Sequence, residues 1–187
     1  DRIVPADYDG DGRADIAVYR GGTWFLLRST LGFAAVQFGL ADDIPQPADF
    51  DGDGKAELAV FRPSDGVWYT LNLLTGQFTA VQFGMAGDRP VAADYDGDGL
   101  ADYAFFRPSD ATWHLRRSAL GLLVRQFGQP GDVPTVGDYN GDGRADLSVF
   151  RNGVWIQLLS GIREVVETQF GLATDLPVPA DYVGDRR

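Results

Sequence analysis

The sequence of 187 residues contains no cysteine and only one histidine, His114. The absence of cysteine excludes disulfides and thiolate metal sites, and the shortage of both residue types disfavours zinc and iron. A Ser-His-Asp or Cys-His catalytic centre would have to be built around His114. No apolar run approaches the roughly 18 residues of a membrane-spanning helix, so we expect no membrane span. Met85 is the only methionine, and we expect the chain to be a processed piece of a longer protein.

Basic residues are also scarce. Sixteen lysine and arginine residues stand against 27 aspartate and glutamate residues, which gives a formal net charge of −11. Because affinity for phosphate groups depends on positive charge, neither nucleic acid nor an anionic membrane surface is an expected partner. The hydrophobic content of 44% and the aromatic content of 12% are those of a folded protein. The acidic residues therefore need another explanation.

A repeat runs through the whole chain. Gln-Phe-Gly occurs at residues 37–39, 82–84, 126–128 and 169–171, and an aspartate follows each glycine by four residues. Counting from these aspartates gives repeats at residues 1–42, 43–87, 88–131 and 132–174, with a partial fifth repeat or closing strand at 175–187. Tryptophan recurs once per repeat, at Trp24, Trp68, Trp113 and Trp155. Such periodicity indicates a repeat architecture.

Each repeat has the pattern of short β-strands, because apolar runs alternate with Gly, Asp, Asn, Ser and Pro and no window has a helical period. In the second repeat the predicted strands are residues 46–50, 57–62, 67–73 and 78–83. Four strands in about 43 residues are typical of a propeller blade; a solenoid has shorter coils, and a sandwich does not predict fourfold periodicity. We predict an all-β β-propeller of four four-stranded blades plus an extra C-terminal strand, as a four-bladed ring or as part of a larger or intermolecular propeller.

The recurrent aromatic and basic residues have structural explanations. One tryptophan and one phenylalanine per repeat supply flat surfaces for packing one blade against the next. An arginine closes the second predicted strand of every repeat, and we expect it to pair with a recurring acid. These arginines are Arg20, Arg62, Arg107 and Arg151.

The acidic residues concentrate in one loop of each repeat, between its first and second predicted strands. Oxygen-bearing side chains occupy loop positions 1, 3, 5 and 9, and glycine occupies positions 4 and 6. Alternate positions on a tightly curled loop can point inward together, which suits the oxygen shell of calcium. The predicted side-chain ligands are Asp7, Asp9, Asp11, Asp15, Asp49, Asp51, Asp53, Glu57, Asp94, Asp96, Asp98, Asp102, Asp138, Asn140, Asp142 and Asp146. The backbone carbonyl of position 7 is a further predicted ligand, from Arg13, Lys55, Leu100 and Arg144.

The loops differ from EF-hands. An EF-hand needs a glutamate at position 12 and flanking helices, whereas position 12 here is Val18, Val60, Phe105 or Val149 in an apolar strand. Magnesium is disfavoured because it prefers compact octahedral geometry and retains water. Acidic turns are common in hairpins, but four copies in register favour metal binding. A fifth, degraded copy begins at Asp181, where Val183 replaces the second ligand, and it is not expected to bind metal.

The Asp-x-Asp-x-Asp-Gly-x-x-Asp loop between strands, together with Phe-Gly in each repeat, resembles the FG-GAP/VCBS repeat family. That family includes integrin α-subunit propellers, fungal propeller lectins and many secreted bacterial proteins. The resemblance covers all four repeats and implies a β-propeller with one calcium ion per loop, about four in total. It also implies an extracellular setting, secreted or at the cell surface, and a role in adhesion or ligand binding. Family propellers typically have seven blades, so closure of a ring by this chain alone stays open.

Our leading hypothesis is a secreted, calcium-stabilised, lectin-like binding module that takes a glycan or an extracellular protein and catalyses no reaction. One alternative is a self-assembling structural protein that associates through its C-terminal strand. Another is a polysaccharide lyase or hydrolase, or its accessory domain, which would need acids outside the loops. Those candidate acids are Asp65, Asp110, Glu164 and Glu167.

The third repeat breaks the pattern with basic residues. His114, Arg116, Arg117 and Arg125 form a locally basic stretch that the other repeats lack. A purely structural demand would fall on all repeats alike, so an anionic ligand is most reasonably sought here. The histidine itself follows Trp113 on a predicted strand, which favours a packed or surface role over a catalytic one.

Overall fold

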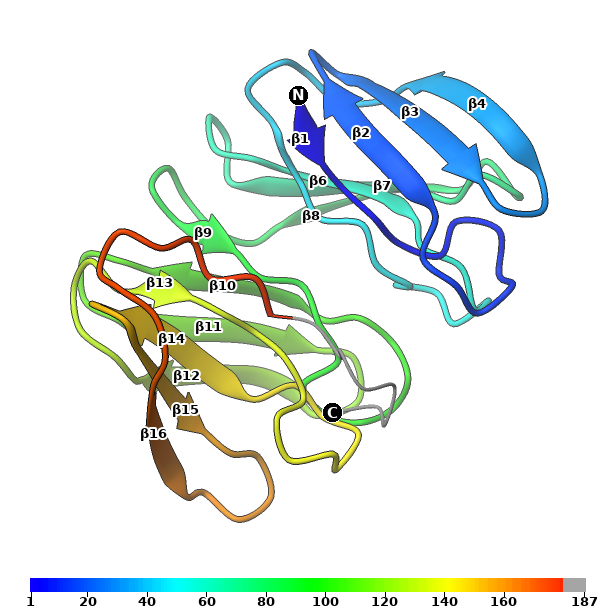
Figure 1. Ribbon diagram of the computed structural model, residues 1–187. Helices are drawn as coiled ribbons and strands as arrows, with labels where there is room; N and C mark the ends of the chain where they lie inside the picture. Colours follow the sequence, from blue (N-terminus) through cyan, green and yellow to red (C-terminus); the bar gives the residue numbers. More distant parts are fainter. Residues whose placement is uncertain (180–187) are drawn as a thin grey trace. The chain divides into compact units, whose positions relative to one another are not determined.

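The structure is a computed structural model that describes residues 1–179. The chain divides into two compact units, Asp1–Ala92 and Ala93–Arg187. Residues 1–179 are all-β, and they contain no helix of the length and apolarity that would cross a membrane. The strands form four four-stranded antiparallel sheets, which are the blades of a β-propeller fold (Figure 1).

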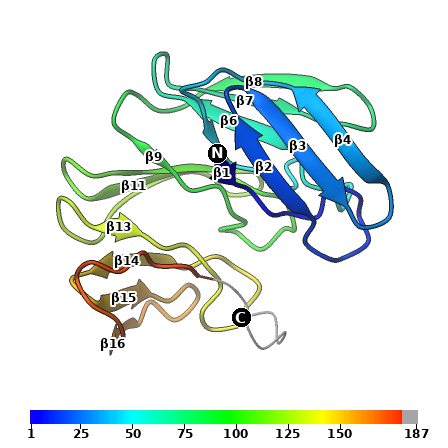
Figure 2. The ribbon, with the colours of Figure 1, turned by 45° about the horizontal axis from the view of Figure 1, so that its top comes forward.

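Each sheet takes its strands in sequence order, and each lies within one sequence repeat. The first contains β1 (Arg2–Ile3), β2 (Ile16–Arg20), β3 (Thr23–Arg28) and β4 (Gly32–Gln37). The second contains β5 (Ile44–Pro45), β6 (Leu58–Arg62), β7 (Val67–Leu71) and β8 (Phe78–Gln82). The third contains β9 (Arg89–Pro90), β10 (Tyr103–Arg107), β11 (Thr112–Arg117) and β12 (Gly121–Gln126). The fourth contains β13 (Val133–Pro134), β14 (Leu147–Arg151), β15 (Val154–Leu158) and β16 (Val165–Gln169). We call these sheets blades 1 to 4; β2, β3 and β4 of blade 1 lie side by side in both ribbon views (Figure 2).

Burial explains why the two middle strands of each blade form the core. In β3 the side chains of Trp24 and Leu26 are fully buried, while their neighbours face the other side of the sheet, as the two-residue period of a strand requires. β6 differs, because four consecutive residues, Leu58 to Phe61, are buried on both faces. The last strands, such as β4, alternate half-buried and exposed residues and cover the blade's outer side.

The prediction of the first strand was wrong in position. In the second repeat the expected strand at residues 46–50 is replaced by β5, which ends at Pro45. Pairing with β6 continues only through the bond from Gln46 N to Ala59 O and through an isolated bridge between Ala48 and Glu57. Pro45 and Pro47 lack amide protons, so they cannot donate to a continuous ladder. The chain then enters the acidic loop.

The extra C-terminal strand is not formed in the residues that the structure describes. Residues 176–179 have no strand assignment, although residues 176–177 correspond to β5, β9 and β13 of the complete repeats. The rest of the predicted strand, and the degraded loop at Asp181, lie outside the described residues.

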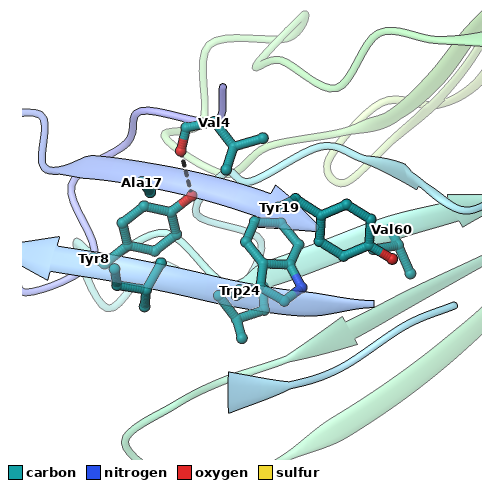
Figure 3. Close-up of a cluster of buried hydrophobic side chains, with 8 residues drawn as sticks. Val4, Tyr8, Ala17, Tyr19, Trp24 and Val60 are labelled. Carbon is teal, nitrogen blue, oxygen red and sulfur yellow. Dashed lines mark hydrogen bonds between the residues drawn. The ribbon is translucent and has the colours of Figure 1, made fainter. Parts of the chain in front are cut away.

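A core cluster in the first unit joins blades 1 and 2 (Figure 3). The rings of Tyr8, Trp24 and Tyr19 lie in a row, and the Tyr8 hydroxyl donates to the carbonyl of Val4 at 2.6 Å. Tyr19 and Trp24 meet edge to face with centroids 5.1 Å apart. Leu58 and Val60 of β6 complete the cluster, so the aromatic face of one blade is packed by the second strand of the next. This agrees with the role predicted for the recurrent tryptophan.

Candidate metal centre

The acidic loops lie where the sequence placed them, between the first and second strands of each blade. In the first loop both oxygens of Asp7, at position 1, accept backbone bonds from glycines. Gly10 N donates to Oδ1 at 2.6 Å and Gly12 N donates to Oδ2 at 2.7 Å. Both glycines have positive φ, 82° and 83°, which side chains rarely adopt. The same two bonds recur at Asp49, Asp94 and Asp138. The position-1 aspartate thus holds the curl of every loop.

The aspartate at position 9 anchors the loop to the sheet. Asp15 is 2% exposed; its Oδ2 accepts from Tyr8 N at 2.9 Å and its Oδ1 from Ser29 N at 2.7 Å. Corresponding bonds are made at Asp102 by Tyr95 N and Ser118 N, and at Asp146 by Tyr139 N and Ser160 N. The position-9 acid therefore lies inside the blade, beside the hairpin that joins the third and fourth strands.

In blades 1 and 3 the aspartate at position 3 has one carboxylate oxygen without a hydrogen-bond partner in the described chain. In Asp9, Oδ2 accepts from the backbone and hydroxyl of Thr30, at 2.8 and 2.7 Å, whereas Oδ1 is buried with no hydrogen-bond partner in the described chain. Asp96 repeats this arrangement, with Oδ2 bound by Leu120 N at 2.8 Å and Oδ1 buried without a partner. A buried unpaired carboxylate oxygen is costly, and a bound cation relieves that cost.

These residues fit calcium. One oxygen each of Asp7, Asp9 and Asp15 lies within 4.8 Å of the others, and the same holds for Asp49, Asp51 and Asp53 and for Asp94, Asp96 and Asp102. All the donors are hard oxygens, which is the ligand type of calcium. The position-7 carbonyls of Arg13, Lys55, Leu100 and Arg144 accept no hydrogen bond from a backbone amide of residues 1–179, so they are candidates for further ligands. Calcium ligation by all of the predicted residues, including Asp11, Asp98 and Asp142 at position 5, stays a prediction.

Blade 2 differs from blades 1 and 3. The side-chain amide of Asn72 donates to Asp51 Oδ2 at 2.8 Å, to Asp53 Oδ2 at 3.0 Å and to Glu57 Oε1 at 3.1 Å. Asn72 Oδ1 in turn accepts from Leu74 N at 2.8 Å. One amide group thus contacts three predicted ligands, and the longer Glu57 replaces the usual aspartate at position 9.

Blade 4 has a weaker acid set. Asn140 stands at position 3, and its amide lies 3.3 Å from Asp142 Oδ2. Asn140 Oδ1 accepts from Asp142 N at 2.9 Å. The loop keeps the position-1 and position-9 bonds of the other blades, so it has the same curl with one carboxylate fewer.

Burial and hydrogen bonds drive the acid pKa values in opposite directions. Desolvation raises the pKa of Glu57 to about 7 and that of Asp102 to about 6, and it also raises the pKa of Asp146. Hydrogen bonds from Thr30 lower the pKa of Asp9, and the Ser118 hydroxyl lowers the pKa of Asp98. Burial therefore disfavours the charged form of Glu57, Asp102 and Asp146, and a cation would favour it.

The loops also connect neighbouring blades within each unit. Ala56 N of the second loop donates to Asp7 O of the first at 2.7 Å, and Ala145 N of the fourth donates to Asp94 O of the third at 2.6 Å. The stem of Lys55 lies against Gly10, where an added Cβ would come within 2.9 Å of it, and Arg144 lies against Gly97 in the same way. In the second and fourth repeats the position-7 side chain, which sequence left unassigned, therefore covers the loop of the preceding blade.

Sequence reasoning missed Asn72 and the serines that hold the loop acids. Ser29, Ser118 and Ser160 each donate a backbone bond to the position-9 acid and a hydroxyl bond to the position-5 acid. A signal was present, because each serine stands five residues after the repeat tryptophan, whereas the second repeat has Leu73 at that spacing.

Three of the predicted structural arginines pair with acids, as expected. Arg62 binds both oxygens of buried Asp43 at 2.8 Å, and Arg151 binds both oxygens of Asp132 at 2.7 and 2.6 Å. Arg20 pairs with Asp1 at the surface. The recurring acid after Gln-Phe-Gly is thus explained by structure rather than by ligand binding.

The other candidate polar residues do not assemble into one site. Asp65 and Asp110 each accept from a backbone amide two residues on, as turn residues do. His114 stacks on Phe105 with centroids 4.6 Å apart, and its Nε2 lies 3.1 Å from Thr112 Oγ1. Within the basic stretch, Arg117 and Arg125 line a common crevice, described below, whose lining does not include His114 or Arg116.

The comparisons with known proteins agree with the repeat. The sequence model of the FG-GAP-like repeat matches residues 7–60 and 49–105, which together cover more than half of the chain. No curated protein matches. Among solved structures, a lectin from Agrocybe aegerita, studied for its specific recognition of non-reducing terminal N-acetylglucosamine, is similar with a TM-score of 0.62 and 20% identity. The match covers 87% of this chain and 50% of that one, so this chain spans about half the length of the lectin. The chain belongs to the FG-GAP-like repeat family.

Proposed function

We propose that this chain is a calcium-stabilised, extracellular β-propeller module that binds a glycan and catalyses no reaction. The observation that carries the calcium assignment is the buried, unpaired Oδ1 of Asp9 and of Asp96, each within a cluster of three carboxylates. Bound calcium would supply positive charge to these oxygens and fix the loop. The chain's own residues do the rest: Asp7 holds the curl, and Asp15 ties it to the sheet.

We expect the four loops to differ in calcium affinity. Blades 1 and 3 have a spare buried oxygen and three acids in reach, so we expect them to bind most tightly. Blade 4 replaces one carboxylate by Asn140, and its affinity should be lower. In blade 2 the Asn72 amide competes with a cation for Asp51, Asp53 and Glu57, so this loop should bind most weakly.

Glycan binding is supported by the fold shared with the Agrocybe aegerita lectin. The proposal of a non-catalytic module is supported by the contacts of the polar residues. The loop acids have metal or structural tasks, and the Thr112 hydroxyl donates to Asp110 while contacting His114. This order, acid then hydroxyl then imidazole, differs from a nucleophilic triad, in which the imidazole stands between the other two.

Two measurements test the proposal. Calorimetric titration with calcium should show at least two ions per chain, with a lower-affinity phase for the other loops, and dissociation constants of about 10⁻⁴ to 10⁻³ M are typical of extracellular modules. A glycan array probed in calcium should then give saccharide binding that is lost in EDTA. If calcium gives no heat on titration and does not change the melting temperature, the calcium assignment is contradicted. An array with no bound saccharide would contradict the glycan assignment.

A further inference from the structure

A basic crevice lies between blades 3 and 4 of the second unit. It encloses about 270 Å³, and its lining includes four arginines, namely Arg117, Arg125, Arg144 and Arg163. The remaining lining is largely apolar, with leucines from β11, β12, β14 and β15, and it includes neither aspartate nor glutamate. Two carboxylates outside the lining contact its residue Ser160: Asp142 accepts the hydroxyl and Asp146 accepts the backbone amide.

The four arginines reach the crevice from different elements. Arg117 ends β11, and its guanidinium donates to the carbonyls of Gly121 and Leu120, both at 3.2 Å. Arg125 lies on β12 opposite Trp113. Arg144 comes from the fourth loop and rests its stem on Gly97. None of the four pairs with a carboxylate of residues 1–179.

Arg163 occupies a backbone position that disfavours arginine. Its φ is +56°, in the left-handed region, whereas the matching turn of blade 2 has Gly76 at φ +71°. A side chain in this region carries conformational strain, and such strain is concentrated at functional sites. Glycine would satisfy the turn without strain, so the charge at this position is not explained by the turn itself.

The equivalent crevice of the first unit shows that the fold does not require this charge. There Arg28 and Lys55 occupy the places of Arg117 and Arg144, but the lining also includes the acids Asp53 and Glu57. Its volume is about 90 Å³. Both crevices lie between successive blades beside an acidic loop, yet of these two only the one between blades 3 and 4 gathers four arginines that pair with no carboxylate of residues 1–179.

We propose that this crevice binds an acidic saccharide through its carboxylate or sulfate group. Four guanidinium groups repel one another, and an anion relieves this repulsion while accepting paired hydrogen bonds, for which arginine is suited. The leucine walls match the apolar C–H face of a sugar ring. The volume is below the roughly 300 Å³ at which pockets for drug-sized ligands begin, so one charged sugar unit fits better than a long oligomer. The inference rests on the proposed glycan binding and names its ligand class.

Titration calorimetry in calcium tests the inference with five probes: a hyaluronan tetrasaccharide for the carboxylate, a sulfated chondroitin disaccharide for the sulfate, neutral chitotetraose, inorganic sulfate and inorganic phosphate. We expect at least one acidic saccharide to bind at least tenfold more tightly than chitotetraose and than either inorganic ion. The stronger of the two acidic probes identifies the anionic group. Equal affinity for the acidic and neutral saccharides would overturn the inference and leave glycan binding intact. No binding of any of the three saccharides would also overturn the inference, and the glycan array then decides separately on glycan binding. Equal affinity for inorganic sulfate would show a plain anion site and overturn the saccharide assignment.

Three variants locate the site. R117Q should weaken the acidic saccharide at least tenfold, while the matched R28Q, which removes the same type of arginine-to-carbonyl bond from the first crevice, should leave it unchanged. R163G removes a charge and the backbone strain together, so it should lower affinity while keeping or raising the melting temperature. If R117Q fails to fold, R163G decides. Unchanged affinity in R163G, or an equal loss in R28Q, would overturn the placement.

Discussion

Each aspartate of a loop has a different task, which is set by the bonds that its two oxygens already make. Asp7 uses both oxygens on glycine amides, and Asp15 uses both on Tyr8 and Ser29. Asp9 uses only one, and its Oδ1 is buried without a partner in the described chain. A polar atom without a partner disfavours the folded state, so Asp9, like Asp96 in blade 3, is a residue where the folded chain gains from a cation.

We predict that D9N removes one tight calcium site and leaves the fold intact in EDTA. Asparagine keeps one oxygen for Thr30 or for the cation but carries no charge, so calcium affinity at this loop should fall at least tenfold. Calcium titration calorimetry should show one fewer tight site per chain. The matched control is D42N, which neutralises an exposed acid outside the loops. Equal stoichiometry in D9N and D42N would rule out Asp9 as a ligand.

Ionisation of Tyr19 makes the free energy of unfolding depend on pH in the alkaline range. Burial raises the pKa of its phenol to about 12 from the usual value near 10, and its hydroxyl donates to the carbonyl of Leu40. A raised folded-state pKa contributes stability that is complete below pH 10 and is lost as the pH rises toward 12. We predict that wild type exceeds Y19F by ~1 kcal/mol in urea unfolding at pH 8 and that this difference shrinks above pH 10. A difference that stays constant up to pH 11.5 would contradict the assignment.

At the scale of elements, the Gln-Phe-Gly motif closes each blade. The Trp24 indole donates to the carbonyl of Phe38 at 2.9 Å, and the same bond joins Trp68 to Phe83. Phe38 N also donates to Gly22 O in the hairpin between β2 and β3. The repeat tryptophan therefore does more than fill the core, because it fixes the end of the fourth strand against the third.

The glycine of the motif is required by close packing, and G84A tests this. Gly84 has φ +134°, and an added Cβ would lie 2.7 Å from the Phe61 ring. The matched control is G87A, which also has positive φ, +90°, but meets nothing within 4 Å. We predict a loss of ~1 kcal/mol for G87A from backbone strain and a clearly larger loss, about 3 kcal/mol, for G84A in urea unfolding. Similar losses in both variants would show that backbone strain alone fixes the glycine.

Sequence predicted the blades well where one local pattern decided the structure. The alternation around Trp24, the turn at residues 63–66 and the glycines at loop positions 4 and 6 all indicate their structures directly. The first strand was misplaced because Pro45 and Pro47 break the ladder, so apolar character alone did not mark pairing. Asn72 could not be assigned, because its contact with Asp51 joins residues 21 positions apart and depends on the hairpin's path.

At the scale of the whole molecule, the loops combine two tasks that the sequence showed separately. They carry most of the acidic charge, and through Ala56 and Ala145 they also join successive blades within each unit. A change in loop conformation in blade 1 or 3 is therefore passed to the contact with the next blade. Four calcium ions, with eight positive charges, would raise the net charge from −11 to −3.

This coupling predicts that calcium removal and salt act on the same interactions. In EDTA the loop carboxylates repel one another, so the melting temperature should fall relative to 1 mM calcium, and raising the salt from about 20 to 500 mM should restore part of the loss by screening. With calcium bound the loop charges are compensated, and the same change in salt should have a smaller effect. Differential scanning calorimetry in all four conditions measures this, with sucrose at equal osmolality as the control for non-ionic effects. An identical salt dependence with and without calcium would show that the loop charges do not set the stability of the fold.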